Sequence, residues 1–151
     1  MLTLIDSHNH FDDAGFDEDR DAVYQRAQAA GVAAQVLNAV CVRLWPRLKT
    51  VAAAYPGLYP CYGLHPVWLA EHRPEHLDQL AAWIAQEQPI AIGECGLDFY
   101  LPDLNPDAQA EYFAGQLRLA RHHDLPVIIH ARHAVDQVIK QVRRFAGVRG
   151  M

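Results

Sequence analysis

Short apolar runs alternate with longer amphipathic runs along the whole chain. The apolar runs predict strands at 2–6, 33–40, 58–66, 89–94 and 126–131, the third of which runs into a Gly-His-Pro turn. Between and after them, apolar residues at helical spacing predict helices over 18–30, 43–54, 74–87, 106–123 and 134–145. The strands are apolar throughout rather than alternating, which is typical of a parallel sheet covered on both faces. The pattern therefore predicts an α/β fold of repeated strand-helix units.

The strand-helix units follow one another without a break in composition. No low-complexity segment and no Gly/Ser-rich linker divides the chain, so residues 1–151 are expected to belong to a single domain. The final segment, 147–151, follows the last predicted helix at the point where a sixth strand would begin. The alternation is therefore interrupted rather than finished.

Composition and charge narrow the possible functions. The chain has 151 residues, of which 51% are hydrophobic, so it can bury a core of its own. Its formal net charge of −5 gives no general attraction for nucleic acid or for an anionic membrane surface. No apolar stretch approaches the roughly 20 residues that span a bilayer. If the protein meets phosphates, a local site must hold them.

Three cysteines, Cys41, Cys61 and Cys95, form no Cys-x-x-Cys pair, and we do not expect the first residues of the sequence to be a secretory segment. These features favour a reduced, cytoplasmic setting. Because free cysteine buries readily, we expect all three thiols in the core rather than in catalysis.

Metal-binding residue types recur at the ends of successive predicted strands. His8 and His10 follow the first strand, His65 the third, Glu94 the fourth and His130 the fifth. In a parallel sheet these ends share one edge, where α/β proteins build their sites. Mixed imidazole and carboxylate ligands suit zinc, manganese or iron, and a shared carboxylate also allows two ions side by side. A purely structural role stays open for His65.

Four motifs together resemble the TatD family of metal-dependent deoxyribonucleases, within the amidohydrolase superfamily. They are DSHNH at 6–10, GLHP at 63–66, GECGLDFY at 93–100 and PVIIHAR at 126–132. The resemblance runs through essentially the whole chain. It implies a TIM-type (β/α)8 barrel, of which this chain supplies about the first five units, with two divalent metal ions (Mg, Mn or Zn) at its C-terminal face.

The resemblance also implies roles for individual residues. His8 and His10 would bind the first ion, Glu94 would bridge both ions, and His130 would bind the second. His65 and Arg132 would contact the substrate, and Asp98 would orient a metal-bound imidazole. Glu94 is thus the expected catalytic residue of this chain, acting with a water that the ions activate.

The implied activity is removal of nucleotides from the 3′ end of DNA, with single-stranded ends as the preferred partner. Metal ions would supply the positive charge that the acidic surface lacks. Three aromatic residues beside the motifs, Phe11, Phe99 and Tyr100, are candidates for stacking on bases, with ordinary loop packing as the alternative for each.

The chain departs from the family pattern in length. Another metal-binding histidine and the family's general-base aspartate would lie beyond position 151. We therefore expect a fragment with little activity of its own, with a natural half-barrel as the alternative. Unpaired edges at the first and fifth strands would invite pairing, and a homodimer is one expected outcome. Two alternatives remain: a superfamily enzyme acting on another ester or amide, and a non-catalytic metal-binding module.

Overall fold

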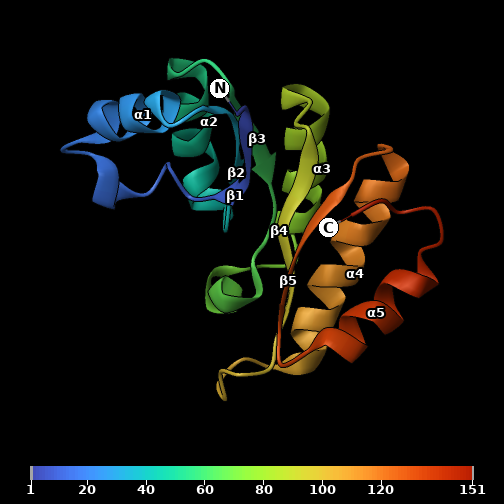
Figure 1. The fold of residues 1–151 in the computed structure, drawn as a ribbon. Helices are drawn as coiled ribbons and strands as arrows, with labels where there is room; N and C mark the ends of the chain where they lie inside the picture. Colours follow the sequence, from blue (N-terminus) through green and yellow to red (C-terminus); the bar gives the residue numbers. More distant parts are fainter. Residues whose placement is uncertain (1, 151) are drawn as a thin grey trace.

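Five parallel strands form one sheet in the order β1-β2-β3-β4-β5 in this computed structural model, which describes residues 2–150 (Figure 1). The strands are β1 Leu4–Asn9, β2 Val32–Asn38, β3 Leu58–Tyr62, β4 Ala91–Asp98 and β5 Val127–Arg132. Each strand pairs with the next along the chain, and every pairing is parallel. The predicted parallel α/β sheet of five strand-helix units is confirmed.

A helix follows every strand. The five helices are α1 Arg20–Ala29, α2 Trp45–Ala54, α3 His76–Glu87, α4 Pro106–His122 and α5 Val135–Arg144. Figure 1 shows α1 and α2 beside β1 to β3, while α4 and α5 lie together beside β4 and β5. Local sequence explains the sharp start of α4, because the Asn105 side chain accepts hydrogen bonds from the N–H groups of Asp107 and Ala108, and Pro106 takes the first helical position.

Three short 3-10 helices, η1 Ala14–Phe16, η2 Val42–Leu44 and η3 Pro66–Glu71, occupy loops that follow β1, β2 and β3. The sequence pattern predicted none of them. The predicted strand over 58–66 ends at Tyr62 in the structure, and η3 begins at Pro66. The His65 side chain accepts a hydrogen bond from the N–H of Val67 and so caps η3. These helices matter because they surround the C-terminal ends of the strands.

The fourth strand differs from its expected position. It was predicted over 89–94, but it runs to Asp98, where it still pairs with Arg132 of β5. Glu94 therefore lies in the middle of a strand rather than at its end. The extension is possible because Gly96 packs directly against the backbone of His130, where a side chain would not fit.

Burial is uneven across the sheet. All eight residues of β4 are buried, as the prediction of strands covered on both faces requires. Strand β1 is exposed along most of its length, so that prediction is wrong there. The reason is that β1 lies at an edge of the sheet and pairs only with β2. Leu4 and Ile5 are the exposed apolar residues of this edge, and the expected homodimer stays a prediction.

The main core lies between the helices and the sheet. Its largest fully buried side chains include Trp45, Tyr62, Leu80, Phe113 and Leu117. The three cysteines are buried and free, as expected. Near the end of the described residues, Gly150 forms an isolated parallel bridge with Val127, where the alternation predicted the start of another strand. Among residues 2–150, no helix is both long and apolar enough to cross a bilayer.

Candidate metal centre

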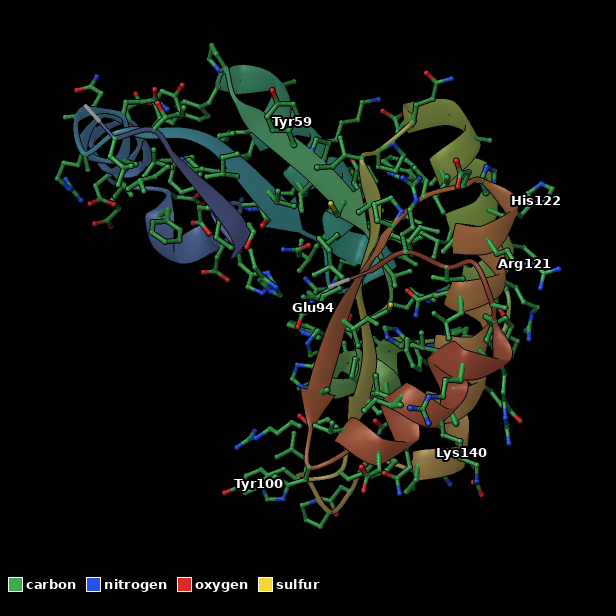
Figure 2. All side chains as sticks on the ribbon, turned by 45° about the vertical axis from the view of Figure 1, so that its right-hand side comes forward. Tyr59, Glu94, Tyr100, Arg121, His122 and Lys140 are labelled. Atoms are coloured by element: carbon green, nitrogen blue, oxygen red, sulfur yellow. The ribbon has the colours of Figure 1, made fainter. Side chains whose placement is uncertain are left out.

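Glu94 stands at the centre of a cluster of four histidines. Its side chain is almost completely buried, and its two oxygens face different partners. Oε2 lies 2.9 Å from His8 Nε2 and 3.4 Å from His10 Nε2. Oε1 lies 3.3 Å from His65 Nε2 and 3.2 Å from His130 Nδ1. Figure 2 shows Glu94 between Tyr59, near the start of β3, and Tyr100, just after β4.

Four different segments bring these histidines together. His8 lies near the end of β1 and His10 one residue after it, His65 lies in the turn after β3, and His130 lies within β5. The expectation that parallel strands would collect these residues at one place is confirmed. The Asp6 carboxylate accepts hydrogen bonds from the His8 N–H and the Asn9 amide and so shapes the end of β1.

Hydrogen bonds determine which nitrogen of two of these histidines carries a proton. His10 Nδ1 lies 2.8 Å from the carbonyl oxygen of Asn38, which can only accept, so in the neutral ring Nδ1 carries the proton and Nε2 keeps its lone pair. His65 has the opposite arrangement. Its Nδ1 accepts from the Val67 N–H, so in the neutral ring Nε2 carries the proton and donates toward Glu94. In these neutral forms His10 Nε2 offers a lone pair that a metal ion could bind, whereas His65 Nε2 offers a hydrogen bond.

Asp98 supports His130. Its Oδ2 lies 2.9 Å from His130 Nε2, while its Oδ1 accepts from the N–H groups of Tyr100 and Leu101. A proton on Nε2 would leave His130 Nδ1 free on the side of Glu94. This is the carboxylate-imidazole arrangement that commonly orients metal-binding histidines.

The electrostatics of the cluster favour a bound cation. Burial by itself raises the pKa of Glu94, but hydrogen bonds with His10, His130 and His65 outweigh burial and hold the pKa of this carboxyl below its usual value. The same contacts with Glu94 raise the pKa of His10 and of His130. An ionised carboxylate among imidazoles is a set of groups that a divalent ion can bind.

Two groups of side chains have the geometry to hold an ion. One consists of His8, His10 and Glu94, and the other of His65, Glu94 and His130, with the ligand atoms of each group within 4.8 Å of one another. Both groups contain Glu94, which offers one oxygen to each. Imidazole and carboxylate donors fit zinc, manganese and related divalent ions. The residues present therefore fit a metal centre.

Two buried glutamines of α4 bind the backbone of segments that carry site residues. The sequence pattern did not single them out. The Gln116 amide donates to the carbonyl of Leu64 and accepts from its N–H, at 3.0 and 2.8 Å. Gln109 makes the same pair of bonds with Asp98, at 2.9 and 2.7 Å. The available signal was the presence of two polar residues on the apolar face of an amphipathic helix, seven positions apart.

Other predicted substrate contacts lie outside the cluster. The guanidinium carbon of Arg132 lies 3.6 Å from the centre of the Tyr100 ring, so Arg132 stacks on an exposed aromatic residue beyond the ends of β4 and β5. Phe11 packs in the core against Phe16 and Tyr55, which leaves its ring unavailable for stacking on a base. Of the two alternatives for Phe11, loop packing is correct.

Comparison with known proteins identifies relatives that share this arrangement of strands. The sequence profile of the family described as TatD related DNase matches residues 5–151. The chain is 36% identical, over 95% of its length, to the uncharacterized metal-dependent hydrolase YjjV of Escherichia coli K12, of which the match covers 56%. It is 37% identical, over 79% of its length, to the 3′-5′ ssDNA/RNA exonuclease TatD of Cronobacter sakazakii, of which the match covers 45%. The chain thus spans about half the length of these curated relatives.

Solved structures agree with the sequence comparison. The crystal structure of YjjV, a TatD homolog from Escherichia coli K12, superposes with a TM-score of 0.90 at 35% identity, covering 94% of this chain and 56% of that one. A TatD family hydrolase from Entamoeba histolytica shares the fold with a TM-score of 0.87 at 22% identity, over 99% of this chain and 57% of the other. The five strand-helix units are therefore the incomplete TIM-type barrel that the sequence predicted, and the chain belongs to the TatD-related family of metal-dependent hydrolases.

Proposed function

We propose that this protein hydrolyses phosphodiester bonds of DNA, removing nucleotides from the 3′ end of single strands with two divalent metal ions. Family membership supports hydrolysis, and the exonuclease activity for which the Cronobacter sakazakii relative is named supports a nucleic-acid substrate. The proposal concerns the protein as a whole, because the chain spans about half of its relatives.

One observation carries the two-ion proposal, namely the division of the four histidines between the two oxygens of Glu94. His8 and His10 face Oε2, and His65 and His130 face Oε1. We assign His8, His10 and Glu94 to the first ion and Glu94 and His130 to the second. Divalent ions held there lower the pKa of a water molecule and stabilise negative charge that develops on a phosphodiester.

The remaining side chains act on the substrate. His65 is the hydrogen-bond donor that we assign to a phosphate oxygen, because its Nδ1 already accepts from Val67 and its Nε2–H is directed into the site. Arg132 is assigned to a phosphate farther along the strand, at the end of β5. Glu94 stays ionised at neutral pH, since its pKa is lowered, and so can hold both ions.

Metal binding tests the site independently of activity. Isothermal titration of the wild-type chain with Mn²⁺ is expected to show two ions per chain. Glu94→Gln keeps the shape of the side chain but removes its charge, and it is expected to abolish both binding events. Glu111→Gln, the same change at an exposed position of α4, serves as the control and should bind as the wild type does. Two ions bound by Glu94→Gln would refute the shared-carboxylate assignment.

Activity is tested next, with single-stranded DNA labelled at its 5′ end. Shortening from the 3′ end in Mn²⁺ or Mg²⁺, lost in Glu94→Gln, would support the proposed reaction. Hydrolysis of a carboxylic ester or amide without cleavage of DNA would favour the wider superfamily instead. Uptake of metal ions without turnover of any substrate would identify the 151-residue chain as a metal-binding module.

A further inference from the structure

A cavity of about 1170 Å³ opens beside the histidine cluster. It is lined by His10 and His65 of the cluster and also by Arg43, Arg47 and Trp68, which lie in or next to the loops after β2 and β3. A strand of nucleic acid that reaches the metal centre could therefore extend into this cavity. The chemistry of the side chains that line the cavity determines which part of such a strand, base or phosphate, would bind there.

Arg43 and Trp68 form a cation-π pair on that wall. The guanidinium carbon of Arg43 lies over the Trp68 ring, 5.5 Å from the ring centre, which is within the range of a cation-π contact. Trp68 belongs to η3, the helix that His65 caps, and the Trp68 N–H donates to the His65 carbonyl at 3.0 Å. The pair is thus tied to a residue of the proposed site.

Glu71 fixes the orientation of the guanidinium group. Its two oxygens accept from Arg43 Nε and Nη2, each at 3.2 Å, in a bidentate ion pair. This pair occupies one edge of the guanidinium and offsets its charge. The Arg43 side chain is 60% exposed, so the group is accessible to a ligand on the side away from its two partners. The Arg43 guanidinium is planar, Glu71 fixes its orientation, and the Glu71 carboxylate offsets its charge. Such a group favours stacking on a base over binding of a charged phosphate.

We propose that Arg43, supported by Trp68 and oriented by Glu71, is a stacking platform for an unpaired nucleobase of the strand that enters the metal centre. Planar guanidinium groups are established stacking partners for splayed bases. The inference rests on the proposed function, because it takes the substrate to be single-stranded nucleic acid. It adds a reason for that preference, since a base in a duplex has no free face to offer.

Binding of a short, fluorescein-labelled oligodeoxyadenylate to the full 151-residue chain tests the platform. Phosphorothioate linkages slow hydrolysis, Mn²⁺ is present, and fluorescence anisotropy measures affinity. The comparison strand carries abasic sites in place of the bases near its 3′ end. Loss of stacking on one base is expected to weaken binding by about 5- to 150-fold. Wild-type protein should therefore prefer the strand that carries bases.

Substitutions separate stacking from charge. Arg43→Lys keeps the positive charge but has no planar face, so it should bind both strands equally weakly. Trp68→Leu should do the same, whereas Trp68→Phe keeps a ring and should retain most of the preference. Arg26→Lys on α1 is the matched control and should behave as the wild type. Thermal unfolding of each variant shows whether it is folded.

The outcomes distinguish this inference from the proposed function. Equal affinity of the wild type for both strands, failure to bind either, or an unchanged preference in Arg43→Lys would overturn the platform. A preference for bases that is lost in Arg43→Lys would support it even if the wild type released no nucleotides, a result that would count against the proposed hydrolysis alone.

Discussion

Asp98 Oδ2 lies 2.9 Å from His130 Nε2, while the other nitrogen of the same ring faces Glu94. In the neutral ring the carboxylate thus holds the proton on Nε2 and leaves the lone pair of Nδ1 on the side of Glu94. A residue that contacts no ion can in this way control how well its neighbour binds one.

Asp98→Asn tests this relationship. The amide oxygen can still accept from the Tyr100 and Leu101 N–H groups, but the amide nitrogen faces His130 as a donor and favours the wrong tautomer. We expect the affinity for the second Mn²⁺ to fall by about 10- to 100-fold, measured by isothermal titration. Asp103→Asn, an exposed change in the following loop, should leave both binding events unchanged. Wild-type affinity in Asp98→Asn would contradict the prediction.

Gln116→Leu should destabilise the fold. The substitution leaves both the N–H and the carbonyl of Leu64 without their present partners in a buried position. Each unpaired group costs about 1–3 kcal/mol, so the free energy of unfolding should fall by about 2–6 kcal/mol. Urea unfolding measures the change. Gln79→Leu on an exposed position of α3 is the control, and an equally small effect of both substitutions would refute the role of Gln116.

Gly96→Ala should be more harmful than an alanine at another glycine with positive φ. A Cβ at Gly96 would lie 2.1 Å from the His130 carbonyl oxygen, in addition to the strain at a φ of +135°. We expect a loss of about 3 kcal/mol or more in the free energy of unfolding. Gly147 has a φ of +90° and no atom within 4 Å of an added Cβ, so Gly147→Ala reports backbone strain alone. That variant should lose about 1–2 kcal/mol.

Cys61 should make stability depend on pH in alkaline solution. Burial raises the pKa of this thiol from 9.0 to about 12. Between those values the unfolded chain loses the thiol proton and the folded chain keeps it, so the free energy of unfolding should fall as the pH rises from 9.0 to about 12. Urea unfolding across this range should show a shallower decline for Cys61→Ala. Identical slopes would contradict the prediction.

The same burial should protect the thiols from reagents. All three cysteines are buried, and burial also raises the pKa of Cys41 and of Cys95. Few thiolates are then available to react. An aromatic disulfide reagent is expected to modify no cysteine in the native chain at neutral pH and all three in denaturant. Rapid modification of the native protein would show that a thiol is accessible.

Sequence alone predicted the strand-helix order, the parallel sheet and the gathering of His8, His10, His65, Glu94 and His130. These predictions rest on strong local signals, namely periodicity and the direction of parallel strands. The sequence pattern placed the end of the fourth strand too early, at Glu94. Residues 94–98 include a glycine and two charged side chains, a composition typical of a loop. Pairing with β5 nevertheless makes them a buried strand.

The sequence pattern could not predict side-chain contacts between different segments of the chain. The contacts of Gln116 with Leu64 join residues that are 52 positions apart in the sequence. Neither local sequence indicates that the two segments are in contact. The Arg43–Trp68 pair depends on two short 3-10 loop regions for which periodicity gives no signal. The sequence could not distinguish stacking on a base from packing in the protein for Phe11. Its place in the core depends on contacts with Phe16 and Tyr55, which lie outside its own segment.

The two glutamines of α4 also make the arrangement of the candidate site depend on the length of helix between them. Gln109 holds the end of β4 and Gln116 holds the turn that carries His65, and about two helical turns separate them. One residue inserted between them would rotate one amide by about 100° relative to the other and detach one of the two segments. The helix acts as a spacer on the outside of the sheet, so the alignment of the two halves of the candidate metal centre depends on residues that no substrate or ion would touch.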